Sequence, residues 1–168
     1  MYQRILVPID GSRTAAVGLD EAIRVARLTH GELRLLHVLD ATAYSAGFEP
    51  TSIYGNDDIA LMKRDSTRIL EQGIARAEAR DVRADGVLLE TATERVCDLV
   101  VAQAVSWGAD LIVIGTHGRR GVARLFMGSD AEQILRAAPV PVLLLRADDV
   151  PGEAIDRANG AFAARSLP

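Results

Sequence analysis

The chain has 168 residues, 49% of them hydrophobic but only 4% aromatic, so we expect one domain with an aliphatic core. Its net charge of −4 argues against broad electrostatic binding of nucleic acid, and its single cysteine, Cys97, excludes an intramolecular disulfide and a cysteine-based zinc site. No apolar run approaches the ~20 residues of a membrane span, and the N-terminus lacks the layout of a signal peptide. These features predict a soluble, cytoplasmic protein in which Cys97 is a buried or half-buried filler.

Strand-like and helix-like segments alternate through the first half of the chain. Residues 5–9 predict a buried strand, residues 10–12 a turn, and Ser12 the N-cap of a helix. That helix carries apolar residues at three- and four-residue spacing and ends at His30-Gly31, a pair typical of helix C-termini. A second strand is expected at 33–39, a loop at 40–56 and a long amphipathic helix at 57–80. His37 then falls within a strand, which is typical of a satisfied core or edge histidine.

The second half continues the alternation. We expect strands at 86–90, 110–114 and 140–145, and helices at 94–107 and 130–138. A domain of residues 1–147 would then be followed by a C-terminal tail at 148–168. The pattern predicts an α/β, Rossmann-like fold: a doubly wound, parallel five-stranded sheet in the order 3-2-1-4-5, with helices on both faces.

A glycine-rich segment follows the fourth predicted strand. Gly115, Gly118 and Gly128 form the pattern Gly-x2-Gly-x9-Gly-Ser, which ends where a helix begins. Glycines allow positive φ and close approach of the backbone, and amides at a helix N-terminus attract anions. In this topology ligands bind where the strand order reverses, between Asp10 after the first strand and Gly115 after the fourth. The sequence therefore predicts a nucleotide site at that edge of the sheet.

Several stretches resemble the universal stress protein family, over residues 2–146. They are Ile-Leu-Val-Pro-Ile-Asp-Gly-Ser12, Asp-Leu-Ile-Val-Ile-Gly-Thr-His-Gly-Arg119, Gly128-Ser129 and Pro-Val-Pro-Val-Leu-Leu-Leu-Arg146. The glycine pattern is similar to that of the nucleotide-binding branch of the family, whereas other branches lack these glycines and do not bind ATP.

This resemblance implies an adenine nucleotide (ATP, ADP or AMP) with Mg²⁺ bound through its phosphates. Ile9, Asp10 and Val38 would contact the adenine and ribose. The residues around ribose and phosphates would be Gly115, Gly118, Arg119, Gly128, Ser129, Asp130 and Ala131. The resemblance also implies a homodimer through the last strand, and the apolar edge predicted at 140–145 agrees with such pairing.

Two residues at the start of the last helix have competing interpretations. Ser129 and Glu132 also fit a capping box, in which the serine caps the helix and the glutamate reaches back. Asp130 departs from the apolar residue that similar family members often carry. If the Asp130 carboxylate points inward and lies about 4 Å from a phosphate charge, the two negative charges repel each other by about 4 kcal/mol at an effective dielectric constant of ~20. A divalent ion that bridged them would remove this repulsion. Pointing outward, Asp130 would offer only its backbone N–H.

The other polar residues of the glycine segment are less specific. Arg119, beside Gly118, is the best candidate for a phosphate contact, whereas Arg120 and Arg124 fit a solvated loop equally well. His117 has no visible orienting partner or nucleophile, so no catalytic residue is predicted. Trp107 and Met127 are expected to pack.

Three functions remain open. The first is a dimeric, ATP-binding regulatory stress-response protein with slow or no hydrolysis, since no general base is evident. The second is an interaction protein of the same fold that has lost nucleotide affinity. A true enzyme is the least supported, because the chain lacks the Gly-x4-Gly-Lys-[Ser/Thr] loop, the dinucleotide fingerprint and a carboxylate cluster for a catalytic metal. No metal-ligating residue is predicted.

Overall fold

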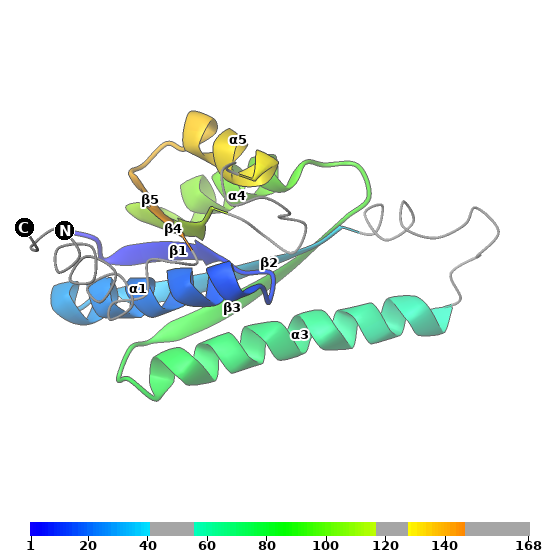
Figure 1. Ribbon diagram of the computed structural model, residues 1–168, viewed down its shortest axis with the longest axis horizontal. Coiled ribbons are helices and arrows are strands. Elements are labelled where there is room, and N and C mark those ends of the chain that lie inside the picture. Colours follow the sequence, from blue (N-terminus) through cyan, green and yellow to red (C-terminus); the bar gives the residue numbers. More distant parts are fainter. Residues whose placement is uncertain (41–55, 117–127, 147–168) are drawn as a thin grey trace, which may run out of the picture.

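A parallel five-stranded sheet forms the centre of the protein (Figure 1). The computed structural model describes residues 1–40, 56–116 and 128–146. The strands are β1 (Arg4–Pro8), β2 (Glu32–Asp40), β3 (Ala84–Thr91), β4 (Leu111–Gly115) and β5 (Val142–Leu145). They lie in the order β3-β2-β1-β4-β5, and every neighbouring pair is parallel. The predicted fold class and strand order are confirmed.

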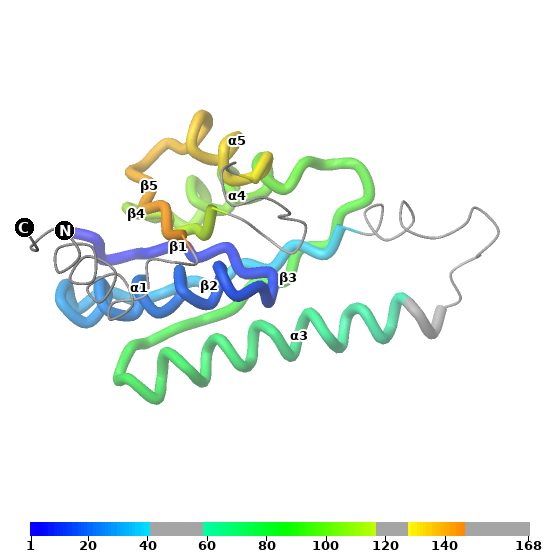
Figure 2. The backbone as a smooth tube through the Cα atoms, viewed as in Figure 1, coloured from blue at the N-terminus to red at the C-terminus, as the bar shows by residue number. Residues whose placement is uncertain are grey.

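Helices cover both faces of this sheet. They are α1 (Arg13–Thr29), α3 (Asn56–Glu78), α4 (Val96–Trp107) and α5 (Ser129–Ala137). Figures 1 and 2 show α1 and α3 on one face and α4 and α5 on the other. Alternate residues of each strand supply the two cores: Ile5 and Val7 pack toward α1 and α3, and Leu6 packs toward α4 and α5. All three side chains are fully buried, as expected for a parallel sheet with two covered faces.

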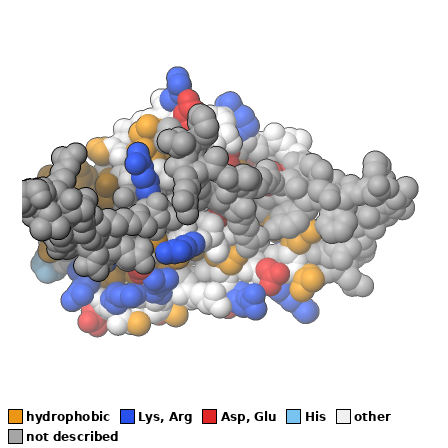
Figure 3. Space-filling view, in the orientation of Figure 1, with side chains coloured by type: hydrophobic (Ala, Val, Ile, Leu, Met, Phe, Trp, Pro, Cys, Tyr) orange, Lys and Arg blue, Asp and Glu red, His pale blue; other side chains and the backbone are white. Residues whose placement is uncertain are grey.

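Charged side chains dominate the outer surface of α1 and α3. Lys and Arg gather over these two helices in Figure 3, with Asp and Glu among them. Arg76 of α3 and Arg80, two residues after the end of that helix, both pair with Asp20 of α1, so α3 and the turn after it are joined to α1 on the solvent side as well as through the core. On the opposite face, the predicted packing residue Trp107 is half-buried beneath Arg34, whose guanidinium carbon lies 4.7 Å from the ring centroid.

The ends of α1 lie where the sequence predicts them. The hydroxyl of Ser12 accepts a hydrogen bond from the Ala15 amide at 3.1 Å, which makes Ser12 the N-cap. At the other end it is His30, with φ of 54°, and not Gly31 that adopts the left-handed conformation. Gly31 serves another purpose, because an added Cβ there would lie 2.6 Å from the Tyr2 carbonyl oxygen.

Most predicted boundaries shift by one or two residues. The last strand is shorter than predicted, since β5 begins only after Pro141. Pro141 has no amide to donate to a ladder, although its carbonyl accepts a hydrogen bond from the Ile112 amide at 3.0 Å. Within the described ranges, no helix combines the length and apolar character that crossing a bilayer requires.

Candidate functional site

The two strand ends predicted to flank the ligand lie next to each other. β1 and β4 are neighbours, with Ile5 opposite Leu111 and Leu6 opposite Ile112. The last residue of β4, Gly115, lies against Thr14 in the first turn of α1. The turn after β1 and the segment after β4 therefore meet at the carboxyl edge of the sheet, from which α1 and α5 also start.

Asp10 organises the turn between β1 and α1. This half-buried carboxylate accepts a hydrogen bond from the Ser12 amide at 2.9 Å through Oδ1. Gly11, between them, has φ of 78°, a conformation that a residue with a side chain rarely adopts. Since Ser12 in turn caps α1, one chain of hydrogen bonds fixes Asp10 relative to the helix.

Residues of β2 contact both backbone groups of Ile9, its amide and its carbonyl. Its amide donates to the Leu36 carbonyl at 2.8 Å, and its carbonyl oxygen lies 2.7 Å from Nδ1 of His37. His37 is 5% exposed, so the expectation of a satisfied core histidine is confirmed. The next residue, Val38, is half-buried and packs with the core on the α4 side, where it offers an apolar surface beside the turn.

Gly115 is required by packing and not by its backbone conformation. Among the described glycines, only Gly11 and Gly108 have positive φ, so the predicted positive φ is not found at Gly115 or Gly128. A Cβ on Gly115 would lie 2.6 Å from Thr14 Cγ2 and 2.9 Å from the Thr14 carbonyl oxygen. The glycine therefore lets the first turn of α1 lie directly against the end of β4.

Thr116 joins the two ends of the glycine-rich segment. Its amide donates to the Leu145 carbonyl at 2.8 Å, and its own carbonyl accepts the Gly128 amide at 2.6 Å. Thr116 and Gly128 therefore lie together at the carboxyl edge of the sheet. Gly118 and Arg119, like His117, Arg120, Arg124 and Met127, lie outside the described residues. Sequence patterns do not identify Thr116 as a residue of the site; its place directly after a predicted buried strand is the one feature that points to it.

The capping box, one of the two interpretations of Ser129 and Glu132, is not formed at α5. Gly128 is the N-cap, with φ of −60° and ψ of 146°, and its carbonyl accepts the Glu132 amide at 3.0 Å. Ser129 is therefore the first residue of the helix, and the Glu132 carboxylate pairs with Arg136 at 2.9 Å instead of reaching back. The hydrogen bond from the Gly128 amide to the Thr116 carbonyl fixes this earlier start of α5.

The first turn of α5 presents backbone amides at the site. N–H groups in a first helical turn have no acceptor within the helix, and the helix dipole adds a partial positive charge there. Ser129 and Asp130 are exposed and Ala131 is buried, so the Asp130 side chain reaches solvent.

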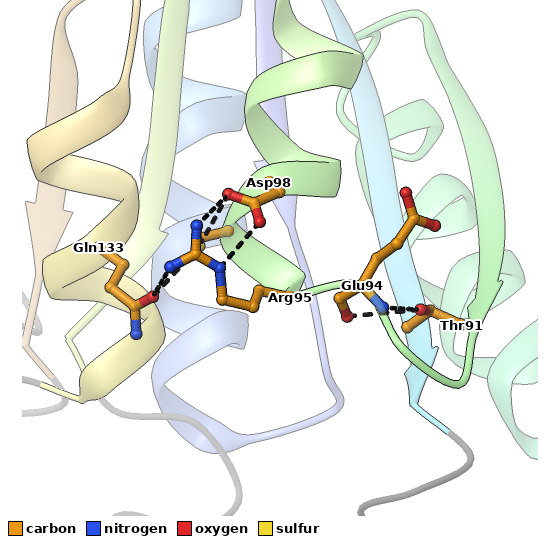
Figure 4. A network of polar contacts seen from close by, with 6 residues as sticks. Thr91, Glu94, Arg95, Asp98 and Gln133 are labelled. Atoms are coloured by element: carbon orange, nitrogen blue, oxygen red, sulfur yellow. Dashed lines mark hydrogen bonds and ion pairs between the residues drawn. The ribbon is translucent and has the colours of Figure 1, made fainter.

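A polar network connects the start of α4 with α5 (Figure 4). Arg95 makes two hydrogen bonds to Asp98, at 2.8 and 2.9 Å, and a longer one of 3.4 Å to Gln133 of α5. The hydrogen bond from Arg95 lowers the pKa of Asp98, while burial raises the pKa of the neighbouring Cys97 thiol. Cys97 is 2% exposed, which confirms it as a buried filler.

No group of three or more His, Cys, Asp or Glu side chains that could hold a metal ion occurs within residues 1–40, 56–116 and 128–146. The chemistry of the described site is that of an anion and polar-ligand site: backbone amides of α5, one carboxylate at Asp10 and the apolar surface of Val38.

The family model described as the universal stress protein family matches residues 1–146. The chain belongs to this family. A putative universal stress protein of Staphylococcus epidermidis is 30% identical over 151 residues, which cover 89% of this chain and 87% of that protein. A crystal structure of a universal stress protein family member from Burkholderia pseudomallei is 32% identical, with a TM-score of 0.68 over 85% of this chain and 95% of that one.

Two more distant universal stress protein structures contain adenine nucleotides. One, from Archaeoglobus fulgidus, is a complex with dAMP, at 22% identity and a TM-score of 0.62 over 86% of this chain and 98% of that one. The other is a complex with cAMP, at 21% identity and a TM-score of 0.61 over 87% of this chain and 98% of that one. At these identities the likeness establishes the shared fold.

Proposed function

We propose that this universal stress protein binds an adenine nucleotide, ATP, ADP or AMP, at the carboxyl edge between β1 and β4. The observation that carries the proposal is the start of α5. Its first-turn amides lie beside the hydrogen bond from the Gly128 amide to the Thr116 carbonyl. Such a helix start suits a phosphate. The nucleotide complexes of the two distant family members support the choice of adenine.

Two groups of described residues would contact two different parts of the nucleotide. Val38 would contact the adenine ring through its half-buried apolar surface, and Asp10 would accept hydrogen bonds from the ribose hydroxyls. Gly115, Gly128, Ser129, Asp130 and Ala131 would surround the phosphates, with Gly118 and Arg119 contributing from outside the described residues. Because the Asp130 side chain is exposed, its charge would be largely screened by solvent.

We expect Mg²⁺ to enter with the phosphates, because no cluster of ligating side chains is present in the described parts of the chain. When bound, the ion would neutralise phosphate charge. The function we propose is regulatory: bound nucleotide stabilises one arrangement of the site, with hydrolysis slow or absent.

We further propose that the protein pairs with a second copy through β5. Among the residues that the structure describes, β5 is an edge strand whose only sheet neighbour is β4. Val142, Leu143 and Leu144 are only half-buried in the single chain, so a partner strand would bury more of their surface and pair their backbone groups.

The first experiment measures the nucleotide directly. Freshly purified protein is denatured, and the supernatant is analysed for adenine nucleotides by chromatography and mass. The stripped protein is then titrated with ATP, ADP and AMP, each with and without Mg²⁺. Saturable binding supports the proposal, whereas no binding at millimolar ATP with Mg²⁺ would point to an interaction protein of the same fold.

A substitution at the first position of α5 tests whether its amides hold the phosphates. Ser129→Pro removes one N–H, yet proline suits the first position of a helix, and Gly128 already has the extended ψ of 146° that a following proline requires. Loss of one charge-assisted hydrogen bond, about 1.5–3 kcal/mol, should weaken ATP binding roughly ten- to hundredfold.

The matched control is Ser129→Ala, which keeps the amide and removes only the hydroxyl. We expect its dissociation constant for ATP, measured by calorimetric titration, to stay within about threefold of the wild-type value, a change below roughly 0.7 kcal/mol. Equal losses in the two variants would assign the phosphate contact to the hydroxyl. Unchanged binding in Ser129→Pro would remove the helix start from the site.

A further inference from the structure

His37 is a buried polar residue near the carboxyl end of β2, the same edge of the sheet at which the candidate site lies. It lies in β2 between Leu36 and Val38, and its ring is 5% exposed. Buried polar atoms in native proteins almost always have hydrogen-bond partners. The partner of Nδ1 is the carbonyl oxygen of Ile9, 2.7 Å away and 28 positions earlier in the chain.

The hydrogen bond fixes which ring nitrogen carries the proton. A carbonyl oxygen can only accept, so Nδ1 must donate. The bond links β2 to the peptide immediately before Asp10, one residue after the end of β1. From there the chain of hydrogen bonds continues: Asp10 accepts from the Ser12 amide, and Ser12 accepts from the Ala15 amide.

We infer that His37 is a positioning residue for nucleotide binding: its Nδ1–H holds the Ile9 carbonyl, and thereby sets the place of Asp10 at the carboxyl edge of β1. The inference rests on the proposed function. The Asp10–Ser12 and Ser12–Ala15 hydrogen bonds are local to the turn and would move with it. Two groups of β2 hold Ile9 from the sheet: the Leu36 carbonyl accepts from its amide, and the His37 imidazole donates to its carbonyl, the group directly before Asp10. Holding a binding group in place before the ligand arrives lowers the entropic cost of association.

Three variants separate this role from general stability. His37→Leu keeps the apolar volume and removes the donor. His37→Asn restores a donor, because the asparagine amide nitrogen occupies nearly the position of Nδ1. The matched control is Thr29→Val: the Thr29 hydroxyl lies 2.8 Å from the Tyr2 carbonyl oxygen, just before β1, and 2.9 Å from the Val25 carbonyl oxygen of α1, so it shares its proton between acceptors at the end of the strand away from the site.

The dissociation constant of AMP and the free energy of unfolding in urea are measured for all four proteins. We expect His37→Leu to weaken AMP binding roughly three- to tenfold, the worth of one net hydrogen bond. His37→Asn should bind within about twofold of wild type, and Thr29→Val should lose stability without losing affinity. Wild-type affinity in His37→Leu, no recovery in His37→Asn, or an equal loss in Thr29→Val would each overturn the inference.

Amide hydrogen exchange gives a second reading that needs no nucleotide. The Ser12 amide, bonded to Asp10, should exchange faster in His37→Leu and return toward the wild-type rate in His37→Asn. The Gly31 amide, bonded to Ala26 at the far end of α1, should not respond. Failure of the wild-type protein to bind AMP would refute the proposed function, and unchanged Ser12 exchange in His37→Leu would separately refute the positioning role.

Discussion

Gly115 and Gly18 meet where α1 crosses β4, and they respond differently to an added methyl group. At Gly115 the new Cβ would lie 2.6 Å from Thr14 Cγ2 and 2.9 Å from two backbone atoms of Thr14. At Gly18, inside α1, its nearest neighbour would be the Gly115 amide nitrogen at 3.5 Å, an ordinary contact. One position forbids the side chain, and the other tolerates it.

The substitution of each glycine by alanine should therefore have opposite effects. We expect Gly115→Ala to lower the free energy of unfolding by about 1–3 kcal/mol, because the backbone of Thr14 must move. Gly18→Ala should raise it by up to about 1 kcal/mol, since alanine favours a helix interior. Urea unfolding without nucleotide measures both, and a loss at Gly18 as large as at Gly115 would contradict the assignment.

Single residues show where sequence reasoning reached its limit. Asp10 and Gly115 were placed at the crevice by topology alone, because the carboxyl ends of adjacent parallel strands must coincide. The reason for Gly115 was not accessible, since its contact with Thr14 joins positions about a hundred residues apart and appears only when α1 is packed. The anchoring of Ile9 by His37 is likewise a contact between strands that no local pattern encodes.

At the scale of elements, local chemistry predicted the helix ends only where no distant contact intervened. Ser12 caps α1 as expected, because its partner Ala15 is three residues away. Ser129 has the fuller capping signature, with Glu132 three residues later, but does not cap α5. There the Gly128 amide is held by Thr116, so the helix begins one residue earlier than its capping pattern predicts.

The end of α1 offers a test of this view. His30 occupies the left-handed position with φ of 54°, although Gly31 follows it. Glycine adopts that conformation without steric cost, so His30→Gly should raise the free energy of unfolding by about 0.5–1 kcal/mol. Urea denaturation of the variant and the wild-type protein under the same conditions measures this difference.

The control for this helix end is Gly31→Ala. Its Cβ would lie 2.6 Å from the Tyr2 carbonyl oxygen, so this variant should be less stable than wild type by about 1–3 kcal/mol. Destabilisation by His30→Gly would show that the imidazole makes a contribution greater than the backbone strain it imposes.

At the scale of the whole molecule, the two edge strands of the described sheet differ in their side chains: one carries charges and the other is apolar. β3 and β5 both lie at an edge of the sheet. β3 itself carries charged residues: Asp85 pairs with Arg34 of β2, and Glu90 pairs with Lys63 of α3. Such charges discourage pairing with another copy. β5 consists of Val, Leu, Leu and Leu, so it is the edge that suits a partner strand.

Matched substitutions on the two edges test this asymmetry. Val142 of β5 and Val87 of β3 are both half-buried and pack with the core on the α4 side. We expect the wild-type protein to sediment as a dimer at micromolar concentration. Val142→Lys should shift it to a monomer, because a lysine on an edge strand opposes pairing, while Val87→Lys should leave the dimer intact.

Sedimentation velocity, with circular dichroism to verify the fold, distinguishes the possibilities. A wild-type protein that stays monomeric at every concentration would refute pairing altogether. A Val142→Lys variant that still dimerises would place the interface elsewhere. Dissociation in Val87→Lys alone would transfer it to β3 and reverse the argument from charge. The Leu145 carbonyl of β5 accepts a hydrogen bond from the Thr116 amide, so a dimer formed through β5 would be connected to the proposed nucleotide site by one hydrogen bond. We therefore expect ATP to bind more tightly to the wild-type dimer than to the Val142→Lys monomer.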